Sequence, residues 1–330
     1  MIPFEYRRAQ DTETAVATVT GNGRAAYLAG GTNLVDHMKL GLTAPEVLVD
    51  ITGLALDGIE ELPGGGIRLG AGARNSDVAA HPLVRARYPV LARALLSGAS
   101  GQLRNLATVG GNLLQRTRCV YFQDVTTPCN KRSPRAGCSA LDGYTRYHAV
   151  LGASSHCVAV HPSDMAVALA ALDAVVRVRT AAGERTVPAA ELHRLPGEHP
   201  ERDTVLDHGE LITAVDLPPM RFAAHSRYRK ARDRAAFAFA LVSVAVALDV
   251  ADGRVRQVRI AFGGLAHKPW RARVAEQALS GAPAETAEFR AAAEAELADA
   301  VPLRDNGFKI PVARAMLVSV LRELAGEGVA

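Results

Sequence analysis

The clustering of the cysteines constrains the fold of this 330-residue chain more than any other feature of its sequence. The chain has four cysteines, and all of them lie within 39 consecutive residues: Cys119, Cys129, Cys138 and Cys157. Between Gln115 and Ser155 the apolar periodicity of helices and strands is lost, and prolines, glycines and arginines replace it. Such a stretch has few apolar side chains with which to pack a core of its own. We therefore expect an ordered insertion or a long loop at about residues 115–158.

Three explanations compete for the cysteines: two disulfides, a zinc site or an iron–sulfur cluster. Disulfides are the least favoured, because the chain shows no export signal and reducing compartments keep thiols reduced. Structural zinc usually uses paired Cys-x-x-Cys knuckles, whereas the gaps here are nine, eight and eighteen residues. A [4Fe–4S] cluster needs four thiolates without knuckle spacing and fits better. His156, next to Cys157, remains an alternative ligand.

Composition and charge exclude several classes of protein. The chain is 48% hydrophobic and long enough for two or three packed units. Its longest nearly unbroken apolar run, Ala235–Leu248, has 14 residues, short of the roughly 20 that cross a bilayer, so we expect no membrane span. The net charge of +4 forms no basic stripe interleaved with aromatics, so we expect no nucleic-acid partner. The N-terminal MIPFEYRR lacks an apolar signal region, which predicts a cytoplasmic protein, or a periplasmic one exported with a signal-bearing partner subunit.

Strand and helix patterns alternate in the first two thirds of the chain. "AAYLAGGTNLVDHMKLG" predicts a strand ending near Leu28, a glycine turn and a helix from about Thr32, and "EVLVDI" predicts a buried strand, so a β-α-β unit is expected. From Gly66 to about Leu217 the pattern is richer in strands. Strands are expected at "GIRLGAGA", "HCVAVHP" and "AVVRVRT", and helices at "HPLVRARYPVLARALLSGA" and "SDMAVALAALDA".

A domain boundary is expected at Pro218 and Pro219, between two apolar segments. The apolar run Ala235–Leu248 follows, then an Asp-Gly turn, a strand at "VRQVRIAFGG" and three helical stretches through Leu324. We therefore expect a first domain over 1–220, with subdomains 1–55 and 56–220, and a compact α+β domain over 221–330.

Two glycine motifs are candidate binding sites. In "LAGGTNL" a strand ends in two glycines before a helix, which presents free N–H groups to an anion such as a phosphate, although a tight turn alone explains the pattern equally well. In "TVGGN", Gly110 and Gly111 permit a positive φ and the close approach of another molecule, but an ordinary turn would have the same sequence.

Two charged residues are weaker candidates. Asp164 in "HPSDMA" stands in the first turn of an expected helix that begins after Pro162 and Ser163, where the helix dipole favours it without any ligand. Lys230 in "YRKARDR" has the default interpretation of a solvated basic face.

Taken in order, "AGGTNL", "LGAGA", "TVGGN", "HPSDMA" and "YRKARDRAAFAFA" resemble the FAD-binding subunits of the molybdenum hydroxylases, the family of xanthine dehydrogenase, carbon monoxide dehydrogenase and aldehyde oxidoreductases. The resemblance spans nearly the whole chain. It implies an α/β and α+β architecture: a two-subdomain FAD-binding fold of the PCMH type, followed by a smaller C-terminal α+β domain.

The resemblance also implies the residues that hold the cofactors. Pyrophosphate-binding residues would be Leu28, Ala29, Gly30, Gly31, Thr32, Asn33 and Leu34. Thr108, Gly111 and Asn112 would bind the phosphate or ribityl region, and Asp164, Ile212 and Lys230 would line the flavin. The chain is similar to a subset of the family, the flavin subunits of bacterial periplasmic aldehyde oxidoreductases, in which four cysteines after the GGN motif hold a [4Fe–4S] cluster.

The implied function is electron transfer within a larger oxidoreductase. A molybdenum-cofactor subunit would oxidise the organic substrate, a [2Fe–2S] subunit would pass electrons singly to FAD, and the flavin would deliver them to an external electron acceptor. No residue of this chain would act on the organic substrate. Lys230 would favour the anionic reduced flavin. The alternative is a stand-alone flavin oxidoreductase with a structural zinc site made by the four cysteines.

Overall fold

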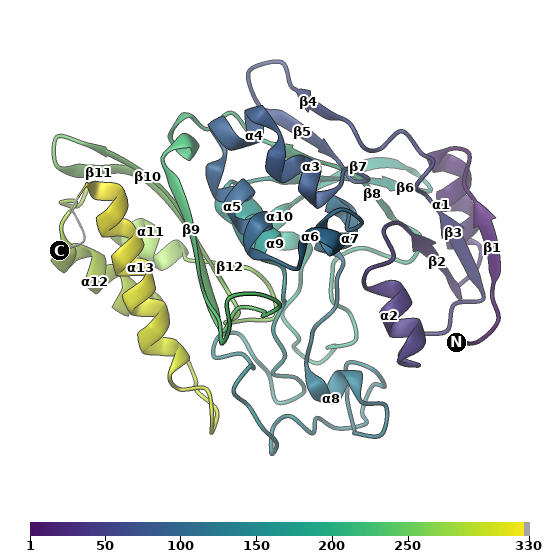
Figure 1. The fold of residues 1–330 in the computed structure, drawn as a ribbon. Helices are drawn as coiled ribbons and strands as arrows, with labels where there is room; N and C mark the ends of the chain where they lie inside the picture. The colour runs from purple at the N-terminus through teal and green to yellow at the C-terminus, as the bar shows by residue number, and fades with distance from the viewer. Residues whose placement is uncertain (327–330) are drawn as a thin grey trace.

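Three β-sheets with surrounding helices organise the computed structural model, which describes residues 1–326 (Figure 1). The first sheet is parallel, in the order β1-β3-β2, and its elements are β1 (Glu5–Arg8), α1 (Thr12–Thr20), β2 (Ala25–Leu28), α2 (Leu34–Lys39) and β3 (Val47–Asp50). The predicted β-α-β unit is confirmed. Its helix starts at Leu34 and not at Thr32, because Asn33 is the N-cap and has a non-helical backbone.

The second sheet is antiparallel, in the order β4-β5-β8-β6-β7. Its strands are β4 (Ile59–Glu61), β5 (Ile67–Gly70), β6 (Val175–Thr180), β7 (Gly183–Pro188) and β8 (Leu211–Leu217). The accompanying helices are α3 (Asn75–Ala80), α4 (Pro82–Arg87), α5 (Pro89–Ser97), α6 (Gly101–Arg104), α7 (Val109–Leu113), α9 (Asp164–Ala171) and α10 (Ala189–Leu192). The expected strands around β5 and β6 and the expected helix at α9 are confirmed.

The segment expected to be one helix from His81 to about Ala99 forms two helices, α4 and α5. They meet at Tyr88, whose backbone is non-helical (φ −135°, ψ 55°). Pro89 explains the break, because proline lacks an N–H group and disfavours a helical conformation in the residue before it.

The third sheet is antiparallel, in the order β12-β11-β10-β9. Its elements are η1 (Arg221–Ala224), β9 (Ser226–Ala231), β10 (Val242–Ala251), β11 (Arg254–Gly263), β12 (Trp270–Arg271), α11 (Arg273–Leu279), α12 (Thr286–Glu296) and α13 (Lys309–Ala325). The Asp-Gly turn is confirmed: Asp252 and Gly253 both have positive φ, as the tight hairpin between β10 and β11 requires.

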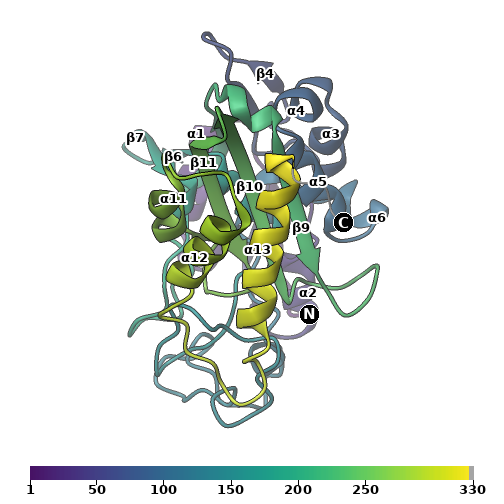
Figure 2. The same ribbon diagram turned by 90° about the vertical axis from the view of Figure 1, so that its left-hand side faces the viewer.

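The apolar run of the third sheet is explained by burial of both faces of β10. Val242, Val244 and Val246 pack in the core with the C-terminal helices, whereas Ala245 packs in the core that contains α5 and α9. Helix α13 covers the sheet on the outer side (Figure 2). Within residues 1–326, no helix is both apolar enough and long enough to cross a membrane.

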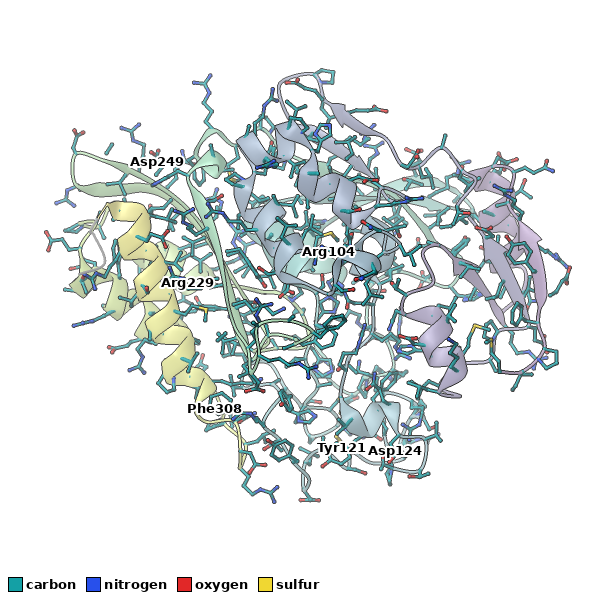
Figure 3. The ribbon with its side chains drawn as sticks, in the orientation of Figure 1. Arg104, Tyr121, Asp124, Arg229, Asp249 and Phe308 are labelled. Atoms are coloured by element: carbon teal, nitrogen blue, oxygen red, sulfur yellow. The ribbon has the colours of Figure 1, made fainter. Side chains whose placement is uncertain are left out.

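The insertion predicted at about 115–158 is confirmed as a long loop. Its regular element is the single turn α8 (Val120–Gln123), and elsewhere it contains turns and isolated bridges. The strand expected at "HCVAVHP" is wrong. Backbone groups of this segment bond to separate partners, such as Ala149 for Val158 and Ala266 for His161, so no strand ladder forms. The insertion lies at the end of the molecule where Phe308 precedes α13 (Figure 3).

Candidate functional site

The first glycine motif connects β2 to α2 and approaches a distant part of the chain closely. Gly31 has a φ of +70°, which residues with a side chain rarely adopt. A Cβ added to Gly30 would lie 1.9 Å from the carbonyl oxygen of Leu106, so only glycine permits this contact. The amides of Gly30, Gly31 and Thr32 donate to no other group in the part of the chain that the structure describes. Free N–H groups on such a turn can hold an anion.

The second glycine motif forms the start of α7, which corrects the expectation of a turn with positive φ. Neither Gly110 nor Gly111 has a positive φ. Thr108 is the N-cap, and its Oγ1 accepts a hydrogen bond from the Gly111 amide at 3.2 Å. Space around Gly110 is tight: an added Cβ would lie 3.2 Å from the Cβ of Ala71.

Two adjoining cavities, which we name the first and second cavity, lie beside these motifs and have volumes of about 290 and 300 Å³. Of the thirteen residues predicted to bind FAD, nine line the first cavity: Ala29, Gly30, Gly31, Thr32, Asn33, Leu34, Thr108, Gly111 and Ile212. Six line the second: Thr32, Asn33, Gly111, Asn112, Asp164 and Lys230. Three residues line both cavities, so the two are neighbours, and we refer to them together as the cleft. Leu28 lines neither, and its carbonyl accepts from the amide of Ile51 beside the first sheet.

Asp164 lies in the first turn of α9, as expected, and it also forms a buried ion pair with Lys230, so the interpretation of Lys230 as part of a solvated face is wrong. Lys230 Nζ lies 2.7 Å from Asp164 Oδ2, and the two side chains are 3% and 7% exposed. Tyr228 Oη donates to Asp164 Oδ1 at 2.5 Å, and burial raises the pKa of this tyrosine well above its ordinary value. The ammonium also donates to the carbonyl of Ser97 at 3.1 Å. The opposite charges of Asp164 and Lys230 therefore balance each other at the wall of the second cavity.

Ser163 connects the start of α9 to the second glycine motif. Its Oγ accepts from the amide of Ala166 at 2.9 Å, which caps α9, and donates to Asn112 Oδ1 at 2.5 Å. The expected helix start at this serine is therefore confirmed. The hydrogen bond fixes Asn112 and Asp164 relative to each other, although 51 residues separate the serine and the asparagine in sequence.

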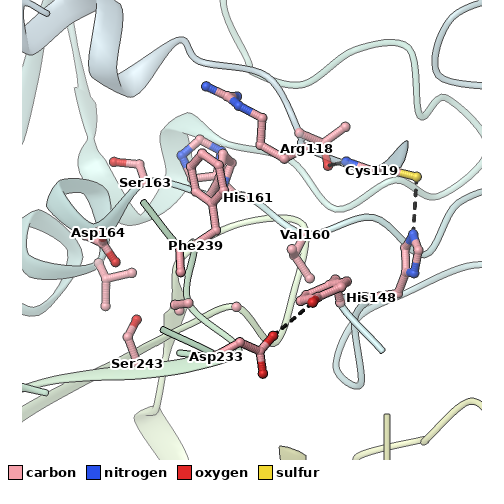
Figure 4. A pocket seen from close by; sticks show the side chains of 18 of the residues that line it. Arg118, Cys119, His148, Val160, His161, Ser163, Asp164, Asp233, Phe239 and Ser243 are labelled. Atoms are coloured by element: carbon pink, nitrogen blue, oxygen red, sulfur yellow. Dashed lines mark hydrogen bonds between the residues drawn. The ribbon is translucent and has the colours of Figure 1, made fainter. Parts of the chain in front are cut away.

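A third cavity of about 450 Å³ lies on the other side of Asp164 and extends to the cysteine loop (Figure 4). Its walls include Asp164 and Phe239 at one end and Cys119 and His148 at the other. Asp164 and Phe239 also line the second cavity. The third cavity therefore borders both the cleft, through Asp164 and Phe239, and the cysteine loop (residues 115–158), through Cys119.

The four cysteines are free thiols that the loop brings into one neighbourhood. Cys129 and Cys138 pair across an isolated antiparallel bridge, and the amide of Asn130 donates to the carbonyl of Gly137 at 2.7 Å beside it. Cys129 and Cys157 are buried, whereas Cys119 and Cys138 are partly exposed.

Electrostatics show that the thiols affect one another. Burial raises the pKa of Cys119 to about 11, and neighbouring Cys129 and Cys138 contribute to the shift. Burial raises the pKa of Cys157 to about 12; Lys131 opposes this, and Cys138 and Cys119 add to it. Within residues 1–326, no three His, Cys, Asp or Glu side chains converge on a position for one metal ion. A cube of four irons and four sulfides holds its thiolates farther apart than a single ion does.

Lys131, two residues after Cys129, is internal and joins the cysteine-bearing loop to a distant segment of the chain. Its side chain is 1% exposed and pairs with Asp203, which also binds Arg116 Nε at 2.6 Å. Burial alone would raise the pKa of Asp203, but Lys131 and Arg116 outweigh it and lower that pKa. Arg132 donates to the carbonyls of Tyr121, Phe122 and Thr127 and braces the same loop.

Sequence reasoning missed the buried histidines of this region. His148 Nε2 lies 3.2 Å from the sulfur of Cys119, and burial, followed by Lys309, lowers the pKa of His148 to about 4. The rings of His161 and His193 are in contact, with centroids 4.0 Å apart and planes tilted by 42°. No local pattern marks their roles, because each packs against a residue distant in sequence. The histidine that the sequence did suggest, His156, is exposed.

Two family models match this chain. A family model described as "FAD binding domain in molybdopterin dehydrogenase" matches residues 2–220, and one described as "CO dehydrogenase flavoprotein C-terminal domain" matches residues 224–324.

Similar proteins are subunits of oxidoreductases. The chain is 50% identical over 324 residues to the aldehyde oxidoreductase FAD-binding subunit PaoB of Escherichia coli K12, covering 98% of each chain. It is 27% identical over 299 residues to the putative xanthine dehydrogenase FAD-binding subunit XdhB of the same organism, covering 90% of this chain and 86% of XdhB. A solved structure of carbon monoxide dehydrogenase from Hydrogenophaga pseudoflava matches with a TM-score of 0.77 and 27% identity, covering 100% of both chains.

Proposed function

This chain belongs to the family of FAD-binding subunits of the molybdenum hydroxylases, and we propose that it transfers electrons through FAD held in the cleft of the first and second cavities. One observation carries the proposal: twelve of the thirteen residues expected to bind FAD line one or both of these neighbouring cavities. They come from segments as far apart in sequence as Ala29 and Lys230.

The donor groups of the cleft suit the parts of FAD. The free amides of Gly30, Gly31 and Thr32 would hold the pyrophosphate, and Thr108, Gly111 and Asn112 would bind beside it. Ile212, Asp164 and Lys230 would contact the flavin. When bound, FAD supplies the ability to accept electrons one at a time and release two. The chain would orient it and supply a fixed charge pair beside it.

We also propose that Cys119, Cys129, Cys138 and Cys157 hold a [4Fe–4S] cluster. Four free thiols gathered in one loop, two of them buried, are the complete ligand set for such a cluster. Lys131 lies close enough to oppose the rise in the pKa of Cys157, and so would favour its thiolate. The cysteine loop and the cleft both contact the third cavity, which supports electron exchange between the two cofactors.

The partners follow from the family. The chain would receive electrons from a [2Fe–2S] subunit supplied by a molybdenum-cofactor subunit, most simply within an aldehyde oxidoreductase, since the relative that is 50% identical is named as a subunit of one. An external acceptor would take the electrons from the flavin. The complex would be cytoplasmic, or periplasmic if a partner carries an export signal.

The test is an absorption spectrum and metal analysis of the protein purified without oxygen, beside a Cys138→Ser variant. We expect a yellow-brown wild-type protein with one FAD and about four irons, and a variant that keeps FAD but loses iron. Zinc in place of iron would support the alternative, a stand-alone flavin oxidoreductase with a zinc site made by the four cysteines. A colourless protein would contradict both cofactor assignments.

A further inference from the structure

A short segment of the C-terminal part of the chain, residues 304–309, forms several hydrogen bonds with the cysteine loop. Arg304 donates to the carbonyl of Gly143 at 2.7 Å. Asp305 Oδ2 accepts from the amide and the hydroxyl of Thr145 at 2.9 and 3.2 Å, and the Asp305 amide donates back to that hydroxyl at 2.9 Å. These bonds join parts of the chain about 160 residues apart.

The last two polar residues of this segment converge on one carbonyl, that of His148. Asn306, which is fully buried, donates through Nδ2 to the carbonyls of His148 and Ala149 at 3.1 Å each. Lys309 Nζ donates to the carbonyls of His148 and Gly264 at 2.8 Å each. The backbone of His148 is therefore held from two sides by side chains of the C-terminal domain.

Lys309 is unusual because its ammonium is fully buried without a carboxylate. Its side chain is 0% exposed, and no Asp or Glu among the described residues lies within ion-pair distance. Burial of an unpaired charge is costly, so such residues normally face an anion or a polarisable group. Lys309 Nζ bonds to the backbone carbonyl of His148, and the ring of the same residue contacts the sulfur of Cys119. Four thiolates around a [4Fe–4S] core leave a net negative charge, which is the kind of partner that Lys309 lacks.

The side chain of His148 contacts Cys119, one of the four proposed cluster ligands. Its Nε2 lies 3.2 Å from Cys119 Sγ, and Figure 4 shows the sulfur directed at the ring. A thiolate bound to iron has no proton to donate, so in the loaded protein this contact must be an N–H donated to sulfur. Hydrogen bonds to the sulfurs of a cluster, and nearby positive charge, stabilise its more negative reduced form and raise its reduction potential.

We propose that His148, held in place by Asn306 and Lys309, sets the reduction potential of the cluster by donating an N–H to Cys119 Sγ. Lys309 adds the positive charge that the reduced cluster requires. Lys309 and Asn306 act as positioning residues, since neither touches a cluster ligand. The inference rests on the proposed [4Fe–4S] site and extends it. The C-terminal domain supplies no ligand, but it adjusts the reduction potential of the cluster.

The experiment is a redox titration of the whole protein, followed by the EPR signal of the reduced cluster, with two variants. His148→Phe keeps a ring but removes the donor, and Lys309→Met keeps the chain length but removes the charge. Each variant is expected to retain FAD and iron and to shift the one-electron reduction equilibrium about tenfold toward the oxidised cluster, which is about 59 mV. Lys39→Met, at the exposed end of α2, removes the same charge and should leave the potential unchanged.

A second measurement does not require the variants to fold. Wild-type protein labelled with 15N-histidine should show a histidine nitrogen coupled to the reduced cluster in pulsed EPR. Absence of this coupling, or iron-loaded variants with the wild-type potential, would overturn the inference while leaving the cluster in place. A wild-type protein without iron would overturn the cluster and the inference together.

Discussion

A single methyl group at Gly30 tests how closely the first glycine motif must approach the segment at Leu106, just before the second motif. In Gly30→Ala the new Cβ would lie 1.9 Å from the carbonyl oxygen of Leu106, which belongs to the backbone and cannot rotate away. We expect a loss of about 1–3 kcal/mol in the free energy of unfolding, typical of overpacking, and a lower FAD content. Gly23→Ala is the control, because its Cβ meets no atom within 4 Å. Equal FAD content in both variants would show that the close approach does not shape the cleft.

Substitution of Lys230 and substitution of Asp164 should shift the flavin potential in opposite directions, because the two side chains form an ion pair. Lys230→Met leaves a buried carboxylate beside Tyr228, so we expect a loss of about 3–5 kcal/mol in stability and a lower flavin potential. Asp164→Asn leaves an excess positive charge and should raise the flavin potential. The double variant should return near the wild-type potential, because the wild-type pair is neutral. Spectroelectrochemistry of the three variants measures this, and a double variant as low as Lys230→Met would show that Lys230 acts without its partner.

At the scale of elements, the sequence predicts well wherever one local rule decides the structure. The hairpin at Asp252 and Gly253 follows from turn chemistry, and the motif before α2 follows from the change of strand to helix periodicity. Errors arise where a distant contact decides. The amides of Gly110 and its neighbour Val109 bond to the carbonyls of Ala71 and Ala73, which holds the motif in a helical turn that no local pattern indicates.

Helix α9 offers a test that separates capping from binding. In Ser163→Ala the amide of Ala166 loses its cap, which costs about 1 kcal/mol, and Asn112 also loses a hydrogen bond. We therefore expect both lower stability and weaker FAD retention. Asp11→Ala is matched to it, since Asp11 caps α1 through the amide of Thr14 at 2.7 Å and lines neither cavity of the cleft. It should lower stability alone, and equal FAD retention in both variants would show that Ser163 only caps the helix.

The candidate site as a whole depends on charges that meet only in the folded molecule. The cleft residues were predicted through the family resemblance that the ordered motifs carry, and the cysteines through their clustering. It did not supply Asp203 as the partner of Lys131, or Lys309 as a neighbour of His148, because each pair joins segments without a shared pattern. Buried charges of this kind are chosen by three-dimensional proximity and desolvation, which a linear sequence does not encode locally.

Lys309 makes the stability of the whole molecule depend on pH in a defined direction. Burial, followed by Arg146, lowers the pKa of Lys309 from 10.5 to about 7. Below pH 7 both the folded and the unfolded chain bind the proton, so the folded state bears the full cost of the buried ammonium. Between pH 7 and 10.5 the unfolded chain binds more protons than the folded chain, so stability rises with pH. In cluster-free protein, Lys309→Met should therefore be the more stable form near pH 7.

That advantage of Lys309→Met should shrink by about 2 kcal/mol from about pH 7.5 to about pH 9, at roughly 1.36 kcal/mol per unit. Urea unfolding of both proteins across this range measures the difference, and groups common to both, such as the thiols, cancel in it. In the iron-loaded protein an anionic cluster would raise the pKa of Lys309 and remove the pH dependence from the window. A difference that stays constant with pH in cluster-free protein would mean that Lys309 keeps its proton in the folded state there too, and the buried ammonium would then need a stabilising partner other than the cluster.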